Sequence, residues 1–189
     1  YSAEFLSSSG LFSRDRPDRA FFADRVMFPI TDSRGRSVAF GGRLLEGDGP
    51  KYLNSPESRI FRKQDNLFAL SAAAQEIRRD RTALVCEGYM DVLAFHQAGI
   101  RYAVAPLGTA FTDGQARLLR RYADQTVFCF DSDEAGQKAT EKALMTAARN
   151  GLRAKILIIE GGKDPAEILE TKGPEQLKNI TSFTINGDD

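Results

Sequence analysis

Residues 126–136 read Thr-Val-Phe-Cys-Phe-Asp-Ser-Asp-Glu-Ala-Gly, an apolar run that ends in two aspartates and passes into a helix signal. Residues 126–130 have the length and composition of a buried strand. Residues two apart in an extended segment point the same way, so Asp131 and Asp133 can both reach one metal ion. Alternatively, Asp133 only caps the helix that follows. Gly136 would let the backbone approach closely where that helix begins.

Three further apolar runs precede loop or helix signals in the same way. Residues 82–86 lead into Glu87-Gly88-Tyr89-Met90-Asp91, residues 155–159 into Lys163-Asp164-Pro165, and residues 102–105 into the acid-free Leu107-Gly108-Thr109. Helix patterns separate the runs, including a capping box at residues 112–115 and a long helix at 134–149. Strands that alternate with helices predict a parallel sheet with right-handed crossovers.

The acidic residues are expected to meet at one edge of this sheet. Ligands of open parallel sheets bind outside the carboxyl ends of the strands, so Glu87, Asp131, Asp133 and Asp164 should converge there. Clustered carboxylates repel one another unless a hard cation neutralises them, and Mg²⁺ prefers oxygen ligands and substrate phosphates. The sequence therefore predicts a magnesium-dependent phosphoryl-transfer centre.

The other acidic positions can be interpreted in more than one way. Glu87 could act as a general base on an attacking hydroxyl or as a metal ligand. Asp91 stands in the first turn of a helix, where the helix dipole alone favours an acid. Asp164 followed by Pro165 and Glu167 matches an N-cap, N1 and N3 series. A capping carboxylate still has outer lone pairs for a metal.

Residues 1–80 follow a different pattern, that of a small α+β subdomain. Residues 26–30 and 37–40 are strand candidates in a hairpin, residues 41–56 are loop-like, and residues 66–79 are expected to form a helix. Between residues 34 and 63 seven basic residues face three acidic ones, a local excess of four positive charges. This excess fits either phosphate binding or a merely solvated basic face.

Bulk properties narrow the class of protein. The 189 residues carry a formal net charge of zero, and no apolar run approaches the roughly 18 residues of a membrane span. Cys86 and Cys129 lack zinc-site spacing and are expected to be buried, reduced thiols of a cytoplasmic protein, while the single His96 is expected to face solvent. No Walker loop is present, which excludes P-loop nucleotide binding.

Taken together, the motifs resemble the catalytic core of bacterial DnaG-type primases, polymerases that lay down RNA primers at replication forks. The acidic strings alone would indicate only a Toprim domain, a module shared with topoisomerases and some nucleases. The primase-like strings are Asp24-Arg25-Val26-Met27-Phe28-Pro29-Ile30, Gly41-Gly42-Arg43, Lys51-Tyr52-Leu53-Asn54-Ser55-Pro56-Glu57, Glu87-Gly88-Tyr89-Met90-Asp91, Leu107-Gly108-Thr109 and Asp131-Ser132-Asp133.

The resemblance implies roles for individual residues. Glu87 is similar to the Toprim glutamate near the reacting hydroxyl, and Asp131 and Asp133 to the metal-binding pair, with Asp91 and Asp164 as further acidic members. The positions similar to those that contact template and nucleotide phosphates are Arg25, Arg43, Lys51 and Lys63, with Asn54 and Ser55 positioning the nucleotide. One departure is Ala166, where such primases often carry an aspartate; either Glu167 substitutes for it, or the enzyme holds its metals with one fewer ligand.

The resemblance also implies a domain layout and an activity. Residues 1–80 would form the basic α+β subdomain, residues 81–175 the Toprim domain, and residues 176–189 the start of the remaining core. The expected activity is Mg²⁺-dependent synthesis of RNA primers from ribonucleoside triphosphates on single-stranded DNA, with Mn²⁺ as a substitute ion. Zinc would belong only to an amino-terminal domain absent here, and the replicative helicase and single-strand-binding protein to an absent carboxyl-terminal domain.

The resemblance further implies a location in the bacterial cytoplasm with the nucleoid and replisome, without membrane contact. Two rival functions remain open at this point. One is a Toprim nuclease or topoisomerase-like enzyme; the other is a non-catalytic module that binds nucleic acid or regulatory nucleotides.

Overall fold

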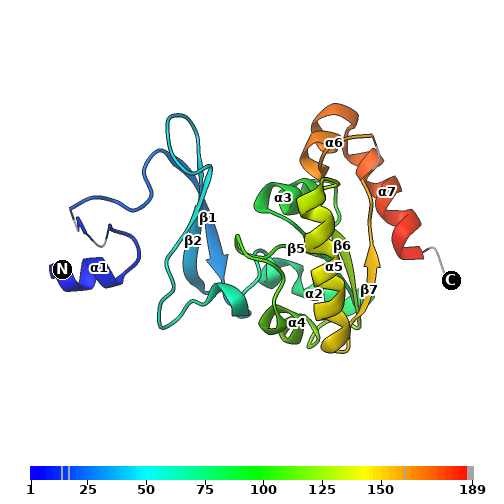
Figure 1. The fold of residues 1–189 in the computed structure, drawn as a ribbon, viewed down its shortest axis with the longest axis horizontal. Helices are drawn as coiled ribbons and strands as arrows, with labels where there is room; N and C mark the ends of the chain where they lie inside the picture. Colours follow the sequence, from blue (N-terminus) through cyan, green and yellow to red (C-terminus); the bar gives the residue numbers. More distant parts are fainter. Residues whose placement is uncertain (14, 17, 160, 187–189) are drawn as a thin grey trace. The chain divides into compact units, whose positions relative to one another are not determined.

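A computed structural model describes residues 1–13, 15–16, 18–159 and 161–186. The chain divides into two compact units, Tyr1–Lys63 and Gln64–Asp189, and each is described by itself (Figure 1). The predicted domains 1–80, 81–175 and 176–189 stay predictions. Residues 14, 17, 160 and 187–189 belong to these predicted ranges but lie outside the described residues.

The first unit is built on a three-stranded antiparallel sheet. It contains helix α1 (Ala3–Ser8), strands β1 (Arg25–Thr31), β2 (Ser37–Leu44) and β3 (Tyr52–Asn54), and the start of the short 3₁₀ helix η1 (Lys63–Asp65), with strand order β1-β2-β3. The predicted hairpin is confirmed. Its turn is fixed by Asp32, whose Oδ1 accepts the backbone N–H groups of Arg34 at 2.9 Å and Arg36 at 3.0 Å.

The predicted loop at residues 41–56 is partly wrong, because it contains the end of β2 and the whole of β3. Gly41 and Gly42 continue β2 and pair with Asn54 and Leu53 of β3. A Cβ atom on Gly42 would lie 2.8 Å from the Phe22 ring, so glycine is needed there for close packing rather than for a turn. Three residues of strand within Gly-rich sequence give too little periodic signal to be predicted.

The second unit is an α/β layer structure, which confirms the predicted fold class. Its four strands are all parallel, in the order β5-β4-β6-β7. The elements in chain order are α2 (Leu70–Asp80), β4 (Thr82–Cys86), α3 (Tyr89–Gln97), β5 (Ala103–Val104), α4 (Asp113–Leu119), β6 (Gln125–Cys129), α5 (Glu134–Arg149), β7 (Arg153–Ile156), α6 (Pro165–Lys172) and α7 (Pro174–Asn186).

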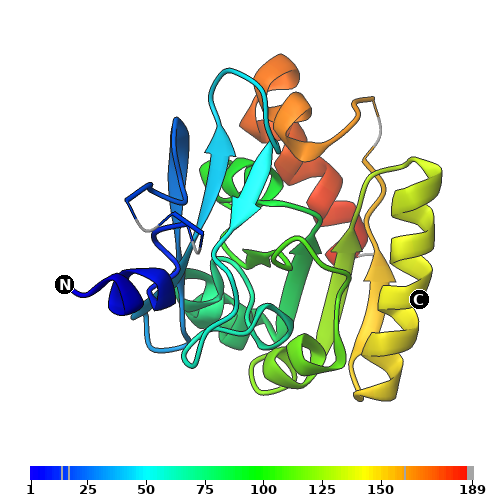
Figure 2. The same ribbon diagram turned by 60° about the vertical axis from the view of Figure 1, so that its left-hand side comes forward.

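Helices cover the central strands, which is why β4 and β6 are buried at every position. On one face, Val85 and Phe128 join a core cluster with residues of α2, α4 and α5. Alternate residues of a strand point to opposite faces, so Leu84 and Val127 fill the other side, where α3 packs on β4 and β5 and contacts α6. Figure 2 shows α5 running along β7 at the edge of the sheet.

Helix α2 begins four residues later than the predicted start at residue 66. The backbone N–H of Phe68 donates to the carbonyl of Ala105 at 2.8 Å, forming an isolated bridge, and Ala69 adopts a left-handed φ of 63°. Tertiary pairing therefore overrides the apolar periodicity at Leu67, which is nevertheless buried. The helix begins at Leu70.

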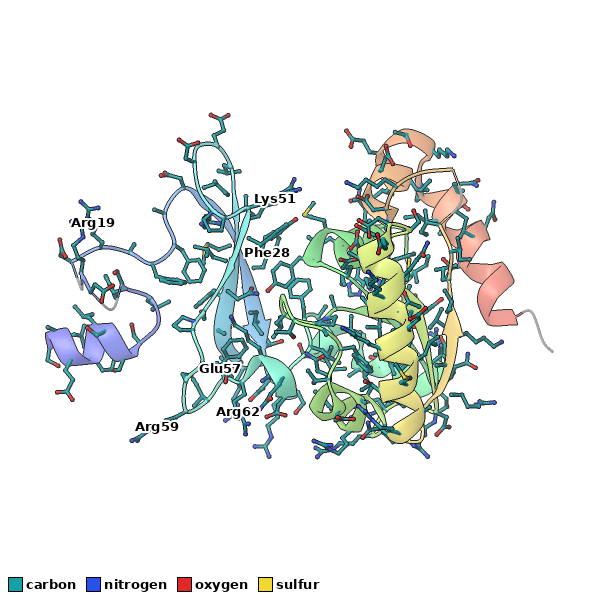
Figure 3. The ribbon with its side chains drawn as sticks, viewed as in Figure 1. Arg19, Phe28, Lys51, Glu57, Arg59 and Arg62 are labelled. Atoms are coloured by element: carbon teal, nitrogen blue, oxygen red, sulfur yellow. The ribbon has the colours of Figure 1, made fainter. Side chains whose placement is uncertain are left out.

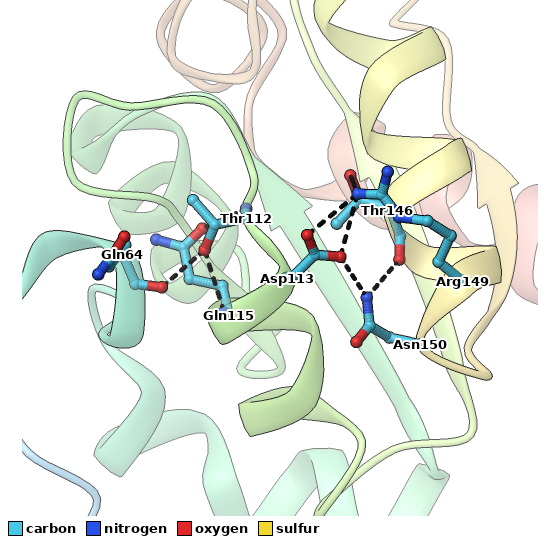
Figure 4. Close-up of polar contacts among 7 residues, drawn as sticks. All are labelled: Gln64, Thr112, Asp113, Gln115, Thr146, Arg149 and Asn150. Carbon is cyan, nitrogen blue, oxygen red and sulfur yellow. Dashed lines mark hydrogen bonds and ion pairs between the residues drawn. The ribbon is translucent and has the colours of Figure 1, made fainter.

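A polar network fixes α4, as Figure 4 shows. The predicted capping box is confirmed: Thr112 Oγ1 accepts the N–H of Gln115 at 3.2 Å, and Gln115 Oε1 accepts the N–H of Thr112 at 3.1 Å. Fully buried Gln115 also donates to the carbonyl of Asn66 at 2.9 Å. Asp113, in the first turn of α4, accepts hydrogen bonds from Arg149, the last residue of α5, and from Asn150, its C-cap.

His96 does not face solvent as predicted. Its side chain is half-buried, and Nε2 lies 2.9 Å from the carbonyl oxygen of Ala103. The sequence pattern predicted a stripe of Met90, Leu93, Ala94 and Gln97, but the buried residues of α3 are Tyr89, Val92, Ala94 and Phe95, so the helix is rotated from the predicted phase. Burial lowers the pKa of His96, and the Ala103 carbonyl opposes that shift.

No helix in the described part of the chain is both long and apolar enough to cross a lipid bilayer.

Candidate metal and nucleotide site

Asp131 and Asp133 lie at the carboxyl end of β6, in the turn that opens α5. Asp133 is the N-cap, and its Oδ1 accepts the N–H of Gly136 at 2.8 Å. A Cβ atom on Gly136 would overlap the carbonyl oxygen of Asp131, so only glycine permits this turn. Asp133 thus has the predicted capping role, while its exposed carboxylate keeps lone pairs for another partner.

Glu87 connects the end of β4 to the end of β6. Its Oε2 accepts the backbone N–H of Asp131 at 3.1 Å, although the two residues are 44 apart in sequence. The strands themselves are in register, with Cys86 paired to Cys129. The Glu87 carboxylate therefore supports the loop that carries the Asp131 carboxylate.

Asp91 is the most perturbed acid of the site. It is mostly buried, and its Oδ2 accepts the N–H of Gly88 at 3.0 Å. Burial raises the pKa of Asp91 to about 7, the Gly88 hydrogen bond opposes that rise, and the negative charges of Asp164, Asp131 and Glu87 add to it. The charged form of a carboxyl group among other carboxylates is stabilised by hydrogen bonds such as the one from Gly88 and by a nearby cation.

Asp131 experiences the same neighbours. Partial burial raises the pKa of Asp131; the charges of Glu87, Asp164 and Asp133 raise it further, and Lys163 lowers it. The loops after β4, β6 and β7 therefore bring these acids within electrostatic reach of one another. Lys163, the neighbour of Asp164 in sequence, supplies a positive charge that moderates the repulsion.

Asp164 is the N-cap of α6. Its Oδ1 accepts the N–H of Glu167 at 2.8 Å, with Pro165 at the first helical position. The Glu167 carboxylate in turn accepts the backbone N–H of Lys163. The predicted capping series is confirmed. Glu167, the candidate substitute for the missing aspartate, is engaged in shaping the Asp164 loop.

These acids suit a magnesium ion whose shell is completed by waters and substrate phosphates. Among the described residues, no three Asp, Glu, His or Cys side chains are arranged to hold a metal ion by themselves. Mg²⁺ is usually held by one or two carboxylates, with waters and substrate phosphates completing its shell. An all-oxygen set, in which the neighbouring carboxylates help to raise the pKa values of Asp91 and Asp131, suits that mode and does not suit a cage made by protein alone.

The predicted basic residues of the first unit differ in how buried they are and in how many contacts they make within that unit. Arg25 is half-buried, and its guanidinium donates to the carbonyl of Gly42 at 3.2 Å. Arg43 lies on β2, paired with Tyr52 across the ladder. Lys51 is exposed, with Nζ 5.9 Å from the centre of the Tyr52 ring. Figure 3 shows Lys51, Arg59 and Arg62, all exposed residues of this unit.

The remaining predicted nucleotide contacts are more enclosed. Asn54 ends β3 and is half-buried. Ser55 is 6% exposed, and its Oγ accepts the N–H of Phe40 at 3.0 Å, so that oxygen supports the sheet. Lys63 is half-buried, and its backbone N–H donates to Glu57 at 2.9 Å.

Sequence reasoning missed one residue of the acidic loop, Gln137. Its Nε2 donates to the carbonyl of Ser132 at 3.1 Å, which tethers the centre of the Asp131–Asp133 turn to α5. The signal available was its position in the first turn of the predicted helix, four residues after Asp133. An exposed glutamine there carries no distinctive chemistry by itself.

Two family models match the chain. Residues 84–169 match a model described as Toprim-like, and residues 1–74 match the N-terminal domain of the DNA primase catalytic core. Among curated proteins, a DNA primase of Treponema pallidum is 46% identical over 178 residues, covering 94% of this chain and 29% of its own length. A DNA primase of Pseudomonas aeruginosa is 47% identical over 160 residues, covering 83% and 24%.

Solved structures agree with these matches. A DNA primase domain from Pseudomonas aeruginosa has a TM-score of 0.85 at 42% identity and covers 96% of this chain, which spans 58% of that one. A DnaG primase catalytic domain bound to single-stranded DNA has a TM-score of 0.83 at 40% identity, with the same coverage. The chain thus spans under a third of these two curated relatives and less than two thirds of the solved domains.

The second unit is a Toprim-like α/β domain with its acids at the carboxyl edge of a parallel sheet. The whole chain belongs to the DnaG-type DNA primases and corresponds to part of their catalytic core.

Proposed function

We propose that this chain carries the polymerising centre of a bacterial DNA primase, which joins ribonucleoside triphosphates into short RNA primers on single-stranded DNA. The observation that supports this most is the meeting of Glu87, Asp91, Asp131 and Asp164 from three separate loops. Family membership supplies the reaction class, and the all-carboxylate chemistry of the site fits a phosphoryl transfer that needs divalent cations.

Asp131, Asp133 and Asp164 are proposed to hold magnesium, with one or two carboxylates to an ion and waters and substrate phosphates in the rest of its shell. Glu87 and Asp91 stand beside them. When bound, the ion neutralises charge that develops on the transferred phosphate. Mn²⁺, which accepts the same oxygen ligands, is proposed as a substitute.

The protein's own groups contribute positioning and proton transfer. Glu87 holds the Asp131 loop through its hydrogen bond, and its exposed carboxylate can accept a proton from an attacking 3′-hydroxyl. Asp91, through Gly88, fixes the turn on which Glu87 stands. Asp133 and Gln137 hold the loop from the side of α5.

The basic residues of the first unit are proposed to bind nucleic acid and nucleotide phosphates. Arg43 and Lys51 are the strongest candidates, while Arg25 and Lys63 combine this role with contacts inside their own unit. Asn54 and Ser55 are proposed to position the nucleotide, Ser55 through the shape of its loop. The DnaG catalytic domain that was solved bound to single-stranded DNA supports single-stranded DNA as the proposed template.

The wider setting is proposed from the family. A zinc-binding domain, the replicative helicase and single-strand-binding protein would engage parts of a longer protein, and the protein would work in the cytoplasm at the nucleoid and replisome.

Primer synthesis by the full-length primase tests this proposal. Labelled ribonucleotides, Mg²⁺ and a single-stranded template are supplied to the wild-type protein, to Asp131→Ala and to Glu170→Ala, an exposed acid of α6 as matched control. Wild type and control should extend primers, and Asp131→Ala should not. Cleavage of the template, retention of it without synthesis, or full activity of Asp131→Ala would each contradict the proposal.

A further inference from the structure

Arginines and lysines are segregated in the second unit. Residues 64–189 contain nine arginines and six lysines. All nine arginines lie toward the amino ends of the parallel strands, whereas the lysines lie on the rest of α5, β7, α6 and α7 and in the loop before α6. We call this surface the arginine face, and its central members are Arg78, Arg81, Arg117, Arg120, Arg121 and Arg153.

The arginine face is at the opposite edge of the sheet from the acids. Arg81 directly precedes β4, and Arg153 is the first residue of β7. In Figure 1 the face lies around α4 and the adjoining end of α5, away from α6, which Asp164 caps. The five residues of β4, at about 3.3 Å each, separate the two edges by roughly 16 Å. The face therefore lies outside the acidic centre.

One carboxylate organises the middle of the face. Asp124, just before β6, accepts hydrogen bonds from Arg81 Nε at 3.0 Å and Nη2 at 2.9 Å, and from Arg120 Nη1 at 2.7 Å. Arg81 also donates to the carbonyl of Tyr122 at 2.9 Å, and the Arg78 guanidinium lies 4.4 Å from the centre of the Tyr122 ring. These contacts hold three guanidinium groups around one point, so less side-chain entropy is lost when a ligand binds them.

The carboxylates around the face do not neutralise its charge. Five of them accompany the nine arginines: Glu76, Asp80, Asp113, Asp124 and, beside Gly114, Asp65. Nine minus five leaves four positive charges. Arg117, Arg121 and Arg153 are exposed and take part in none of the ion pairs that Glu76, Asp80, Asp113 and Asp124 form.

Helix dipoles explain only part of this arrangement. A helix C-terminus favours a positive charge, which accounts for Arg78, Arg120 and Arg149. Lysine would serve a dipole equally well, yet none of the described lysines lies on this face. Arg101 and Arg153 belong to no helix. Arginine differs from lysine in its planar fork, which pairs bidentately with phosphate. The exclusive use of arginine therefore favours a phosphate ligand.

We propose that the arginine face binds the phosphate backbone of nucleic acid outside the catalytic centre and does not read its sequence. The chain belongs to the DNA primases, so nucleic acid is the polyanion that it handles. Contacts to phosphates position a strand without carrying sequence information. The face would hold a strand that extends past the acids. This inference rests on family membership and not on the proposed activity.

Binding of single-stranded DNA to the full-length primase tests the proposal. Fluorescence anisotropy at several salt concentrations gives the slope of log affinity against log salt. Mg²⁺ and ribonucleotides are left out, so the result does not depend on polymerisation. The test variant combines Arg117→Gln, Arg121→Gln and Arg153→Gln. The matched control removes three exposed lysines of the same unit, in Lys142→Gln, Lys172→Gln and Lys178→Gln.

The arginine variant should reduce the slope by about 2, because each phosphate contact contributes about 0.7 for a single strand. Its binding at about 0.1 M salt should weaken at least about tenfold, while the lysine variant should change the slope by less than about 0.5. Both variants should unfold within about 1–2 °C of wild type, since the replaced side chains are exposed. Arg121→Gln alone should reduce the slope by about 0.7, and this variant decides the matter if the triple variant is destabilised.

A wild-type slope in the arginine variant would overturn the inference. An equal loss in the lysine variant would also overturn it, because only the net charge of the unit would then matter. Poly-glutamate that binds the wild type and not the arginine variant, with DNA binding retained by both, would assign the face to an acidic protein segment instead.

Discussion

Replacing Asp91 with asparagine should make the stability of the protein less dependent on pH when divalent ions are absent. Burial among carboxylates raises the pKa of Asp91 to about 7 in the folded chain, from its ordinary value of 3.8. Between these two values the folded state binds a proton that the unfolded state releases. The free energy of unfolding of the wild type therefore falls as pH rises from about 4 to about 7, and stays reduced above that.

The size of the effect follows from the shift. About three pH units at about 1.4 kcal/mol each give roughly 4 kcal/mol as an upper value, and partial solvent exposure lowers it to about 2–3 kcal/mol. The amide side chain of the Asp91→Asn variant keeps an oxygen that can accept the Gly88 N–H, so the local turn is preserved while the charge is removed. The difference between the two proteins should therefore be electrostatic.

Urea unfolding in EDTA at several values between about pH 5 and pH 8 measures this difference. Wild type should lose about 2 kcal/mol relative to Asp91→Asn over that range, and Mg²⁺ should restore part of the loss at the alkaline end. Parallel stability curves for the two proteins would refute the reasoning, because they would show that burial beside the other acids does not raise the pKa of Asp91.

Three further predictions concern the loop, the network and the basic unit. Gly136→Ala should destabilise the chain by about 1–3 kcal/mol and weaken Mn²⁺ binding, because the added Cβ meets the Asp131 carbonyl; calorimetry of both properties checks it, and unchanged binding contradicts it. Gln115→Ala should lower the free energy of unfolding in urea by about 2–3 kcal/mol, against less than about 0.5 kcal/mol for exposed Gln97→Ala, since the half-buried Thr112 N–H and Asn66 carbonyl lose their hydrogen bonds to the buried Gln115; equal losses would exclude that explanation. Lys51→Ala in the full-length primase should weaken binding of single-stranded DNA and reduce the slope of log affinity against log salt by about 1, as fluorescence anisotropy would show; an unchanged slope would remove Lys51 from the phosphate contacts.

The central strands β4 and β6 of the second unit were predictable because they are buried on both faces, whereas β7, at the edge, is Arg153–Ile156 and not the predicted 155–159. The predicted strand at residues 82–86 coincides with β4, whose five positions are all buried. The long helix at residues 134–149 also coincides with α5, since Asp133 marks its start and Asn150 its end. Uniform apolar runs and strong caps are local signals, and local signals survive folding when tertiary contacts agree with them.

The misses arise where tertiary contacts decide. Because Phe68 forms a bridge with Ala105, α2 begins at Leu70 and not at the predicted residue 66. Because β2 pairs with β3, part of the Gly-rich segment predicted as a loop is sheet. The carbonyl of Ala103 holds His96 in a half-buried position that helical periodicity alone did not indicate. The tether from Gln137 to Ser132 depends on side-chain geometry, which no residue pattern encodes.

The convergence of the acids was predicted from their positions just after strands of a parallel sheet. The hydrogen bonds that these acids make were not predicted. Asp133 and Asp164 each use one oxygen for a helix cap, and Glu87 uses one for the N–H of Asp131. Because one oxygen of each of these carboxylates makes a hydrogen bond to the backbone, loops rich in repelling carboxylates can keep a defined shape. The other oxygens are left to a cation and to phosphates.

The most direct measurement is the anomalous diffraction of crystals soaked with Mn²⁺. Our account predicts manganese among the carboxylate oxygens of Asp131, Asp133 and Asp164, with water or phosphate in the rest of its shell, and no peak in crystals of Asp131→Ala. A wild-type crystal with no manganese at these oxygens, or with the same peak in Asp131→Ala, would contradict it.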